Sequence, residues 1–268
     1  MTREVDEANN DEEMLAVNHE RYRYLAYLCF ILSPVAFYYG GRLGFLFLGI
    51  GIFTLWRVRV ALKNAQRHEE ILQAASQLNF EYIGSSDSSF LSGAIAKVGV
   101  KRIVSDFMTG ELFRLPTKCF TVTFWIEKMV EKVSGGKINV EKEVYPYSYS
   151  VFELSIPSTV PPISIVAVST DKDVRSYFLL EEEVLLEGNF NTMFSTSVGK
   201  GKQMEIREFL TPDIMEYLMQ TMPNCSFLFG DGKLYVCTKK FDLSKELIDT
   251  HSNITFLVSK WSPSFSRI

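Results

Sequence analysis

The sequence predicts an α+β fold: an N-terminal transmembrane helical hairpin, followed by a soluble domain with a mainly antiparallel sheet and a few helices. Two observations carry this prediction. Residues 24–56 hold almost no charge, and beyond them apolar and polar residues alternate in runs separated by turn residues. Of the 268 residues, 47% are hydrophobic. Without the apolar stretch about 200 residues remain, which suits one domain.

The apolar stretch consists of two runs, residues 24–39 and 43–56, separated by Gly40-Gly41-Arg42. With its flanking residues each run approaches the roughly 17–25 residues that a membrane helix needs. One continuous helix would place Arg42 near the membrane centre, at a cost of roughly 2.5–3.5 kcal/mol. A turn at the glycines avoids that cost, so we expect a hairpin over residues 24–57. A signal peptide fits poorly, because the preceding region is long and acidic and no small-residue cleavage site follows.

The basic residues predict the orientation of this hairpin. Arg21 and Arg23 precede the first run, four basic residues follow the second, and only Arg42 lies in the turn; the four are Arg57, Arg59, Lys63 and Arg67. Because cytoplasmic flanks carry the excess of Lys and Arg, both termini are expected in the cytoplasm. The prediction is therefore a multi-pass protein of the cytoplasmic membrane, which contacts the lipid bilayer through residues 24–57.

Four segments follow from this division of the chain: an acidic cytoplasmic tail (1–23), the transmembrane hairpin (24–57), a juxtamembrane helix (58–83) and a cytoplasmic α+β domain (84–268). Apolar residues recur at helical spacing between Val58 and Leu78. The polar run Gly84-Ser-Ser-Asp-Ser-Ser89 breaks this pattern, and we place the start of the domain there.

The domain begins with strand signals. Phe120, Val122 and Phe124 alternate with polar residues in a strand over 118–133, and Ser134-Gly-Gly-Lys137 predicts a hairpin turn into a strand ending near Ile156. This register places Lys128 opposite Glu143. Residues 163–169 predict a buried strand, and residues 171–175 a polar loop.

The C-terminal part predicts two helices and a second hairpin. Thr211-Pro212-Asp213 has the residues that begin a helix, and residues 244–261 predict another. Asp231-Gly232 predicts a tight turn between strands 226–229 and 234–237. Phe190 and Phe194 lie one helical turn apart and are expected in the core.

We find no catalytic, cofactor-binding or metal-binding residues to predict. The four cysteines form no CxxC pair, the three histidines are scattered, and GxSxG and HExxH are absent. Residues 199–202 lack phosphate-loop spacing and suggest a hairpin turn, while residues 230–232 lack the other acidic ligands of a calcium loop. The acidic residues at 181–183, 205 and 208 resemble ordinary surface. The net charge of −4 gives no reason to expect nucleic acid as a partner.

Two cysteines are expected to lie near each other in the second hairpin. A two-residue turn places Cys237 opposite Ser226, and a three-residue loop places it opposite Cys225. In either register we expect both thiols to stay reduced, because the expected compartment is reducing and directly paired strand cysteines make strained bridges.

Several short motifs resemble a bacterial family of two-span membrane proteins catalogued as domain of unknown function 3137. They are Leu186-Glu-Gly-Asn-Phe190 with Phe194, Leu210-Thr-Pro-Asp-Ile-Met-Glu-Tyr-Leu218, and Phe227-Leu-Phe-Gly-Asp-Gly-Lys-Leu-Tyr-Val236. The resemblance covers the C-terminal third and the layout of the membrane segment. It implies no known activity and carries over no functional residue.

These observations favour a membrane-anchored cytoplasmic domain that acts as a non-catalytic interaction or scaffold module with a protein partner. A membrane-tethered enzyme whose site assembles only in space is an alternative. A lipid-surface sensor that uses the basic residues after the hairpin is another.

Overall fold

The computed structural model describes residues 41–134, 137–158, 160–241 and 244–265, together with Tyr24, Tyr27, Leu28, Ile31 and Tyr38. The chain divides into two compact units, residues 1–69 and 70–268, which we describe separately. The acidic tail and most of the first apolar run lie outside the described residues.

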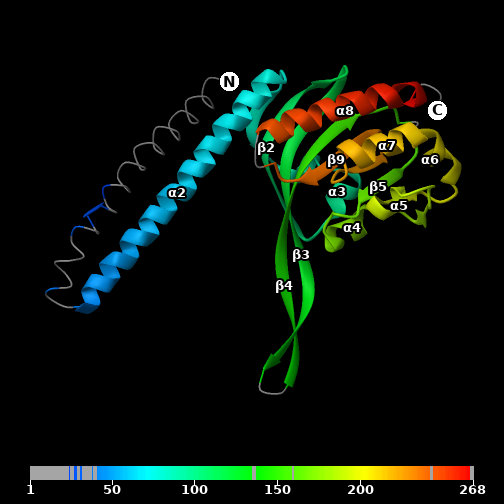
Figure 1. The fold of residues 1–268 in the computed structure, drawn as a ribbon. Coiled ribbons are helices and arrows are strands. Elements are labelled where there is room, and N and C mark those ends of the chain that lie inside the picture. Colours follow the sequence, from blue (N-terminus) through cyan, green and yellow to red (C-terminus); the bar gives the residue numbers. More distant parts are fainter. Residues whose placement is uncertain are drawn as a thin grey trace. The chain divides into compact units, whose positions relative to one another are not determined.

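The first unit contains most of one long helix, α2 (Gly41–Gln77), which continues through the second apolar run into the basic segment (Figure 1). Apolar side chains on several sides of this helix are exposed, among them Ile52, Phe53 and Trp56. Among the described helices, none is both long and apolar enough to qualify as a membrane span.

The second unit is built on one antiparallel sheet in the order β1-β2-β3-β4-β9-β8-β5-β7-β6. Every pairing between its described strands is antiparallel, as the alternating pattern and tight turns predicted. The strands are β1 (Glu81–Ser86), β2 (Lys101–Leu112), β3 (Leu115–Ser134), β4 (Lys137–Ser155), β5 (Ile163–Ala167), β6 (Glu182–Glu183), β7 (Phe194–Val198), β8 (Ser226–Gly230) and β9 (Lys233–Lys239). The α+β class with a mainly antiparallel sheet is therefore confirmed.

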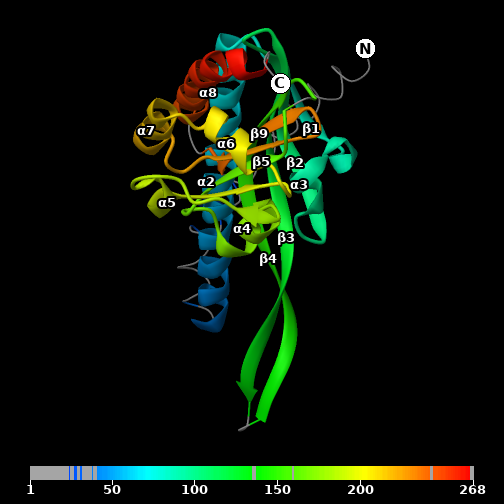
Figure 2. The ribbon, with the colours of Figure 1, turned by 90° about the vertical axis from the view of Figure 1, so that its right-hand side faces the viewer.

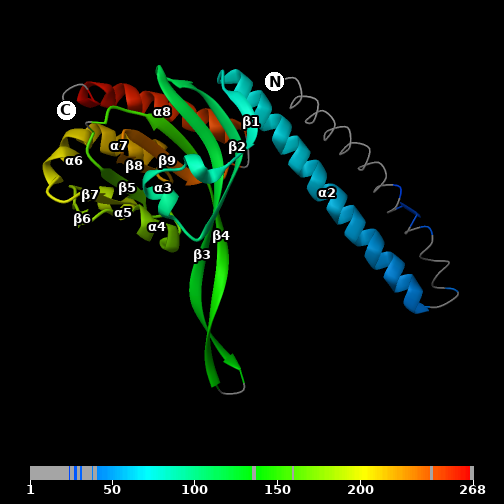
Figure 3. The same cartoon turned by 180° about the vertical axis from the view of Figure 1, so that it is seen from behind.

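Helices cover both faces of this sheet. On one face pack the end of α2, α5 (Phe190–Met193), α6 (Gln203–Phe209), α7 (Pro212–Thr221) and α8 (Ser244–Phe265). The other face carries η1 (Ser88–Phe90), α3 (Gly93–Lys97) and α4 (Lys172–Phe178). Figure 3, the view opposite to Figure 1, shows α3 and α4. The two faces bury separate apolar clusters, because strand residues alternate between them.

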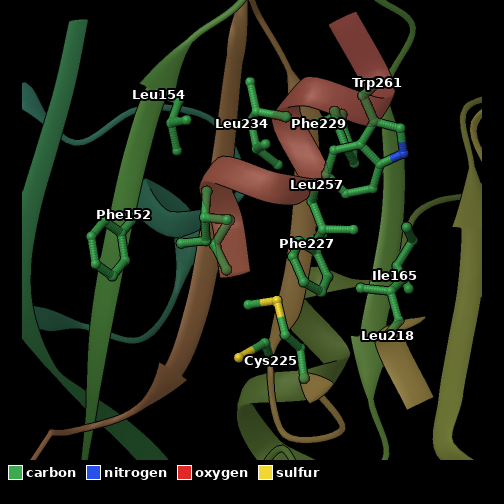
Figure 4. Packing of buried hydrophobic residues seen from close by; sticks show 14 of the residues in the cluster. Phe152, Leu154, Ile165, Leu218, Cys225, Phe227, Phe229, Leu234, Leu257 and Trp261 are labelled. Carbon is green, nitrogen blue, oxygen red and sulfur yellow. The ribbon is translucent and has the colours of Figure 1, made fainter. Parts of the chain in front are cut away.

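The larger cluster includes Trp261 of α8, which Figure 4 shows beside Phe229. Its ring meets those of Phe227 and Phe229 edge-on, with centroids 5.9 and 5.2 Å away. Its indole nitrogen donates to the Phe209 carbonyl at 3.0 Å. The final helix is thus fixed to the sheet by apolar burial and by one buried hydrogen bond, which together set its rotation.

Several predictions of local structure are confirmed. Lys128 pairs with Glu143, and Ser134 with Lys137, while the glycines expected in the turn lie outside the described residues. Cys237 lies opposite Ser226, which is the register of the two-residue turn. Asp231 and Gly232 have φ of 53° and 70°, as a tight hairpin turn of this kind requires. Phe190 and Phe194 are buried and stack at 4.7 Å.

Two predictions are wrong. Residues 171–175 are not a loop: α4 begins at Lys172 and buries Val174 and Phe178, one helical turn apart. Residues 199–202 are not a hairpin turn, because they connect β7 to α6. In the first place the local polar sequence hid a helix that tertiary burial stabilises. In the second, the turn is followed by helix α6 and not by a strand.

The second compact unit begins earlier than the boundary expected at Gly84. Ile71, Ala74 and Ala75 of α2 are buried in its core with Phe80. The polar run that suggested the boundary lies in β1 and η1, where β1 forms one edge of the sheet.

Candidate interaction surface

The most distinctive feature of the second unit is the length of the β3–β4 hairpin. The two strands pair without interruption from Thr117 and Leu154 to Ser134 and Lys137. Strand β2 accompanies β3 only as far as Trp125, and β9 joins β4 only from Tyr149. Residues 126–148, called the arm below, therefore project beyond the sheet as a two-stranded ribbon, as Figure 2 shows. Nine residues at about 3.3 Å each make the β3 side roughly 30 Å long.

The two faces of the arm differ, because successive residues of a strand point to opposite sides. The tyrosine face carries Tyr145 and Tyr147 and, towards the tip, the Lys128–Glu143 pair. It continues into the smaller apolar cluster, where Tyr149 lies just beyond the arm. The methionine face carries Glu127, Met129 and Glu131 on β3 and Val140, Lys142 and Val144 on β4.

The tyrosine face is tied to the start of α4. Tyr147 donates a hydrogen bond from its hydroxyl to Asp173 at 2.6 Å, and Tyr149 donates to Asp171 at 2.8 Å. The Lys128 ammonium lies 2.5 Å from the Asp173 carboxylate and 4.9 Å from the centre of the Tyr145 ring. The hydrogen bond from Lys128 holds the pKa of Asp173 below its usual range. These contacts fix the base of the arm to the domain.

Further out, charge pairs support the ribbon. The Lys132 ammonium lies 2.9 Å from Glu141 and 2.7 Å from Glu143, and hydrogen bonds to these carboxylates raise the pKa of Lys132. A two-stranded ribbon alone is marginally stable in water, so cross-strand pairs of this kind help to keep it extended.

The methionine face has no comparable covering. Met129, Val140 and Val144 are between 50% and 67% exposed. Towards the domain the same face continues through Trp125, over whose ring lies Lys101, to exposed Ile103. One ion pair crosses it, between Lys142 and Glu127 at 2.8 Å. Exposed apolar side chains grouped on one face and flanked by charged residues are typical of surfaces that bind another protein.

A second group of functional residue types is buried at the sheet. Glu153 of β4 is 3% exposed, and one of its oxygens lies 2.9 Å from Lys233 and 3.3 Å from Lys118. Its other oxygen has no hydrogen-bond partner among the described atoms. Nearby, the hydroxyls of Tyr235 and Ser92 share a hydrogen bond of 2.7 Å. Two cations neutralise one buried carboxylate here, so the arrangement is that of a structural charge cluster.

Among the residues weighed for chemistry in the sequence, the structure brings together members of the acidic run at 181–183, the segment 199–202 and Glu205 as ordinary ion pairs and turn contacts. Glu205 pairs with Lys202 at 2.9 Å, and Glu182 accepts from the backbone of Gly201 at 3.2 Å. Cys119, Cys225 and Cys237 are free and buried. No cluster of His, Cys, Asp or Glu able to hold a metal occurs within the part of the chain that the structure describes.

Sequence reasoning missed the acidic anchor of the arm and the buried charge cluster. Asp171 and Asp173 fell in the supposed polar loop, and Glu153 looked like any strand residue. One signal was present: tyrosines at alternate positions 145, 147 and 149 indicate one aromatic strand face.

Comparison with known proteins gives little further constraint. No protein-family model matches the chain, and no curated protein matches its sequence. One solved structure is similar, the crystal structure of the mycobacterial trehalose monomycolate transport factor A, TtfA. The similarity has a TM-score of 0.48 at 11% identity, and it covers 72% of this chain and 94% of that one.

Proposed function

We propose that this protein is a membrane-anchored, non-catalytic interaction module. Residues 24–57 form a hairpin in the cytoplasmic membrane, both termini lie in the cytoplasm, and the α+β domain binds a protein partner through its arm. The exposed methionine face of the arm carries the interaction part of the proposal, since no described helix covers its apolar side chains.

The character of α2 supports the anchoring part. Between Leu48 and Trp56 the exposed side chains of α2 are apolar, among them Ile50, Ile52 and Phe53. A helix that is apolar all round is stable only where something apolar surrounds it. The basic residues that follow the apolar part of α2 favour a cytoplasmic location for the beginning of the α+β domain.

The topology is tested by single cysteine probes in a background where Cys29 is replaced by Ser. Gly41→Cys should react with an impermeant maleimide added outside intact cells, whereas Ala8→Cys and Ser266→Cys should react only after lysis. Labelling of either terminal probe from outside would refute the orientation, and protection of all three would refute the hairpin.

The interaction role is tested by shortening the arm. Lys128 and Glu143 lie directly opposite each other, so replacing residues 129–142 with Asn-Gly should rebuild a two-residue hairpin in the same register. Detergent-solubilised wild-type protein should retain a partner that this variant loses. The matched control is Lys200→Gln, which changes an exposed turn between β7 and α6. Equal capture by all three proteins would overturn the role of the arm.

A further inference from the structure

The methionine face has an arrangement of charges that fits a second copy of itself. Along β3 the sequence on this face is Glu127, Met129, Glu131, and along β4 it is Val140, Lys142, Val144. Each cross-strand pair on this face forms one row of the ribbon. Met129 and Lys142 form the central row, and each neighbouring row consists of one glutamate and one valine. One strand therefore presents two carboxylates around a methionine, and the other presents one ammonium between two valines.

We propose that the arms of two chains pack through their methionine faces about a twofold axis parallel to the strands. Such an axis places β3 of one chain over β4 of the other in the same row. Each Lys142 then lies over Met129 of the second chain, between the carboxylates of Glu127 and Glu131. Successive rows are about 7 Å apart, which a lysine side chain spans in either direction. This inference rests on the proposed function, because it names the partner of the arm.

The alternative face-to-face arrangement is disfavoured by charge. A twofold axis across the strands would set β3 over β3, and Lys142 would face its own copy. Glu127 would face Glu131 in each flanking row. Like charges placed directly opposite each other are destabilising, so the charge pattern selects the parallel arrangement.

The cations of the tyrosine face are engaged within the chain, Lys128 by Asp173 and Lys132 by Glu141 and Glu143. On the methionine face Lys142 pairs with Glu127 of its own chain at 2.8 Å, so the proposed contact shares this cation between the carboxylates of both chains. Anchoring of both chains in one membrane raises the local concentration of the two arms, which favours this contact.

The test is a charge exchange between two differently tagged full-length chains in detergent. One carries Lys142→Glu, and the other carries Glu127→Lys with Glu131→Lys. Wild-type chains should co-purify with each other. Each variant should lose self-association at least about tenfold, because like charges now face each other. The two variants mixed should co-purify, since both cross-chain contacts regain opposite charges. Association of the mixed pair also shows that each variant is folded.

Orientation is tested with cysteine probes and a short bismaleimide. Met129→Cys in one chain should cross-link to Lys142→Cys in the other faster than Met129→Cys cross-links to itself, because the two Met129 side chains are offset by one strand spacing. The control pairs Met129→Cys with Glu143→Cys, which lies on the opposite face. Absence of wild-type co-purification, or failure of the mixed charge pair to associate, overturns the inference. If self-association fails but the shortened arm still loses another protein, the interaction module stands and only its partner changes.

Discussion

The buried charge cluster offers a quantitative test of the structure through Glu153→Gln. This change keeps the size of the side chain and removes its charge. Glu153 is 3% exposed and accepts contacts from two ammonium groups, at 2.9 and 3.3 Å. A hydrogen bond to a charged group contributes about 1.5–3 kcal/mol, and breaking a buried ion pair costs about 3–5 kcal/mol.

The lysines reduce this cost, because their side chains are 36% and 24% exposed for Lys118 and Lys233 and can turn towards water. We therefore expect Glu153→Gln to lower the free energy of unfolding by about 2–3 kcal/mol. For a domain of this size that corresponds to a fall in Tm of roughly 4–12 °C. Thermal and urea unfolding of residues 70–268, followed by circular dichroism, would measure it.

The matched control is Glu205→Gln, which makes the same chemical change in an exposed pair with Lys202. It should leave stability unchanged within error. Lys233→Met should also destabilise, and its effect should be less than additive with Glu153→Gln, because both changes remove one contact. A Glu153→Gln domain within about 0.5 kcal/mol of the unchanged domain would refute the buried cluster, since 0.5 kcal/mol is typical of neutral surface changes.

Three further predictions concern the same domain. A fragment of residues 70–268 should unfold cooperatively and at a higher temperature than a fragment of residues 84–268. The shorter fragment lacks the buried end of α2 and half of β1. Equal Tm values for the two fragments would contradict the observed boundary. Burial raises the pKa of Cys225 to about 11, so a maleimide at neutral pH should modify this thiol only after denaturant is added; rapid modification of the native domain would count against it. Trp261→Phe removes the 3.0 Å hydrogen bond to Phe209 and should cost about 1–3 kcal/mol in urea unfolding, with unchanged stability as the contrary result.

The sequence predicted those parts of the fold in which local and tertiary preferences agree. The β3–β4 register followed from strict alternation and from a glycine turn, and Lys128 faces Glu143 as expected. The β8–β9 hairpin followed from Asp231-Gly232 in the same way. In both, a one-residue slip would move every apolar side chain to the wrong face, so the pattern fixes the pairing.

Elements whose stability comes from distant contacts were missed. Helix α4 is short and begins with polar residues. It is stabilised by the burial of Val174 and Phe178 against the sheet. Strand β2 carries a register irregularity between Ser105 and Met108, where Asp106 has a φ of 51°. That bulge interrupts the alternation by which a strand is detected in sequence.

The candidate surface was beyond sequence reasoning for a related reason. Alternation predicted two faces for β3 and β4, but not which face remains uncovered. That depends on where β2 and β9 stop, at Trp125 and Tyr149, and on the acidic start of α4. Asp171 and Asp173 secure the tyrosine side, so the methionine side is left as the exposed face of a firmly attached ribbon. An attached ribbon with one exposed apolar face loses little conformational entropy on binding, and such preorganisation favours association.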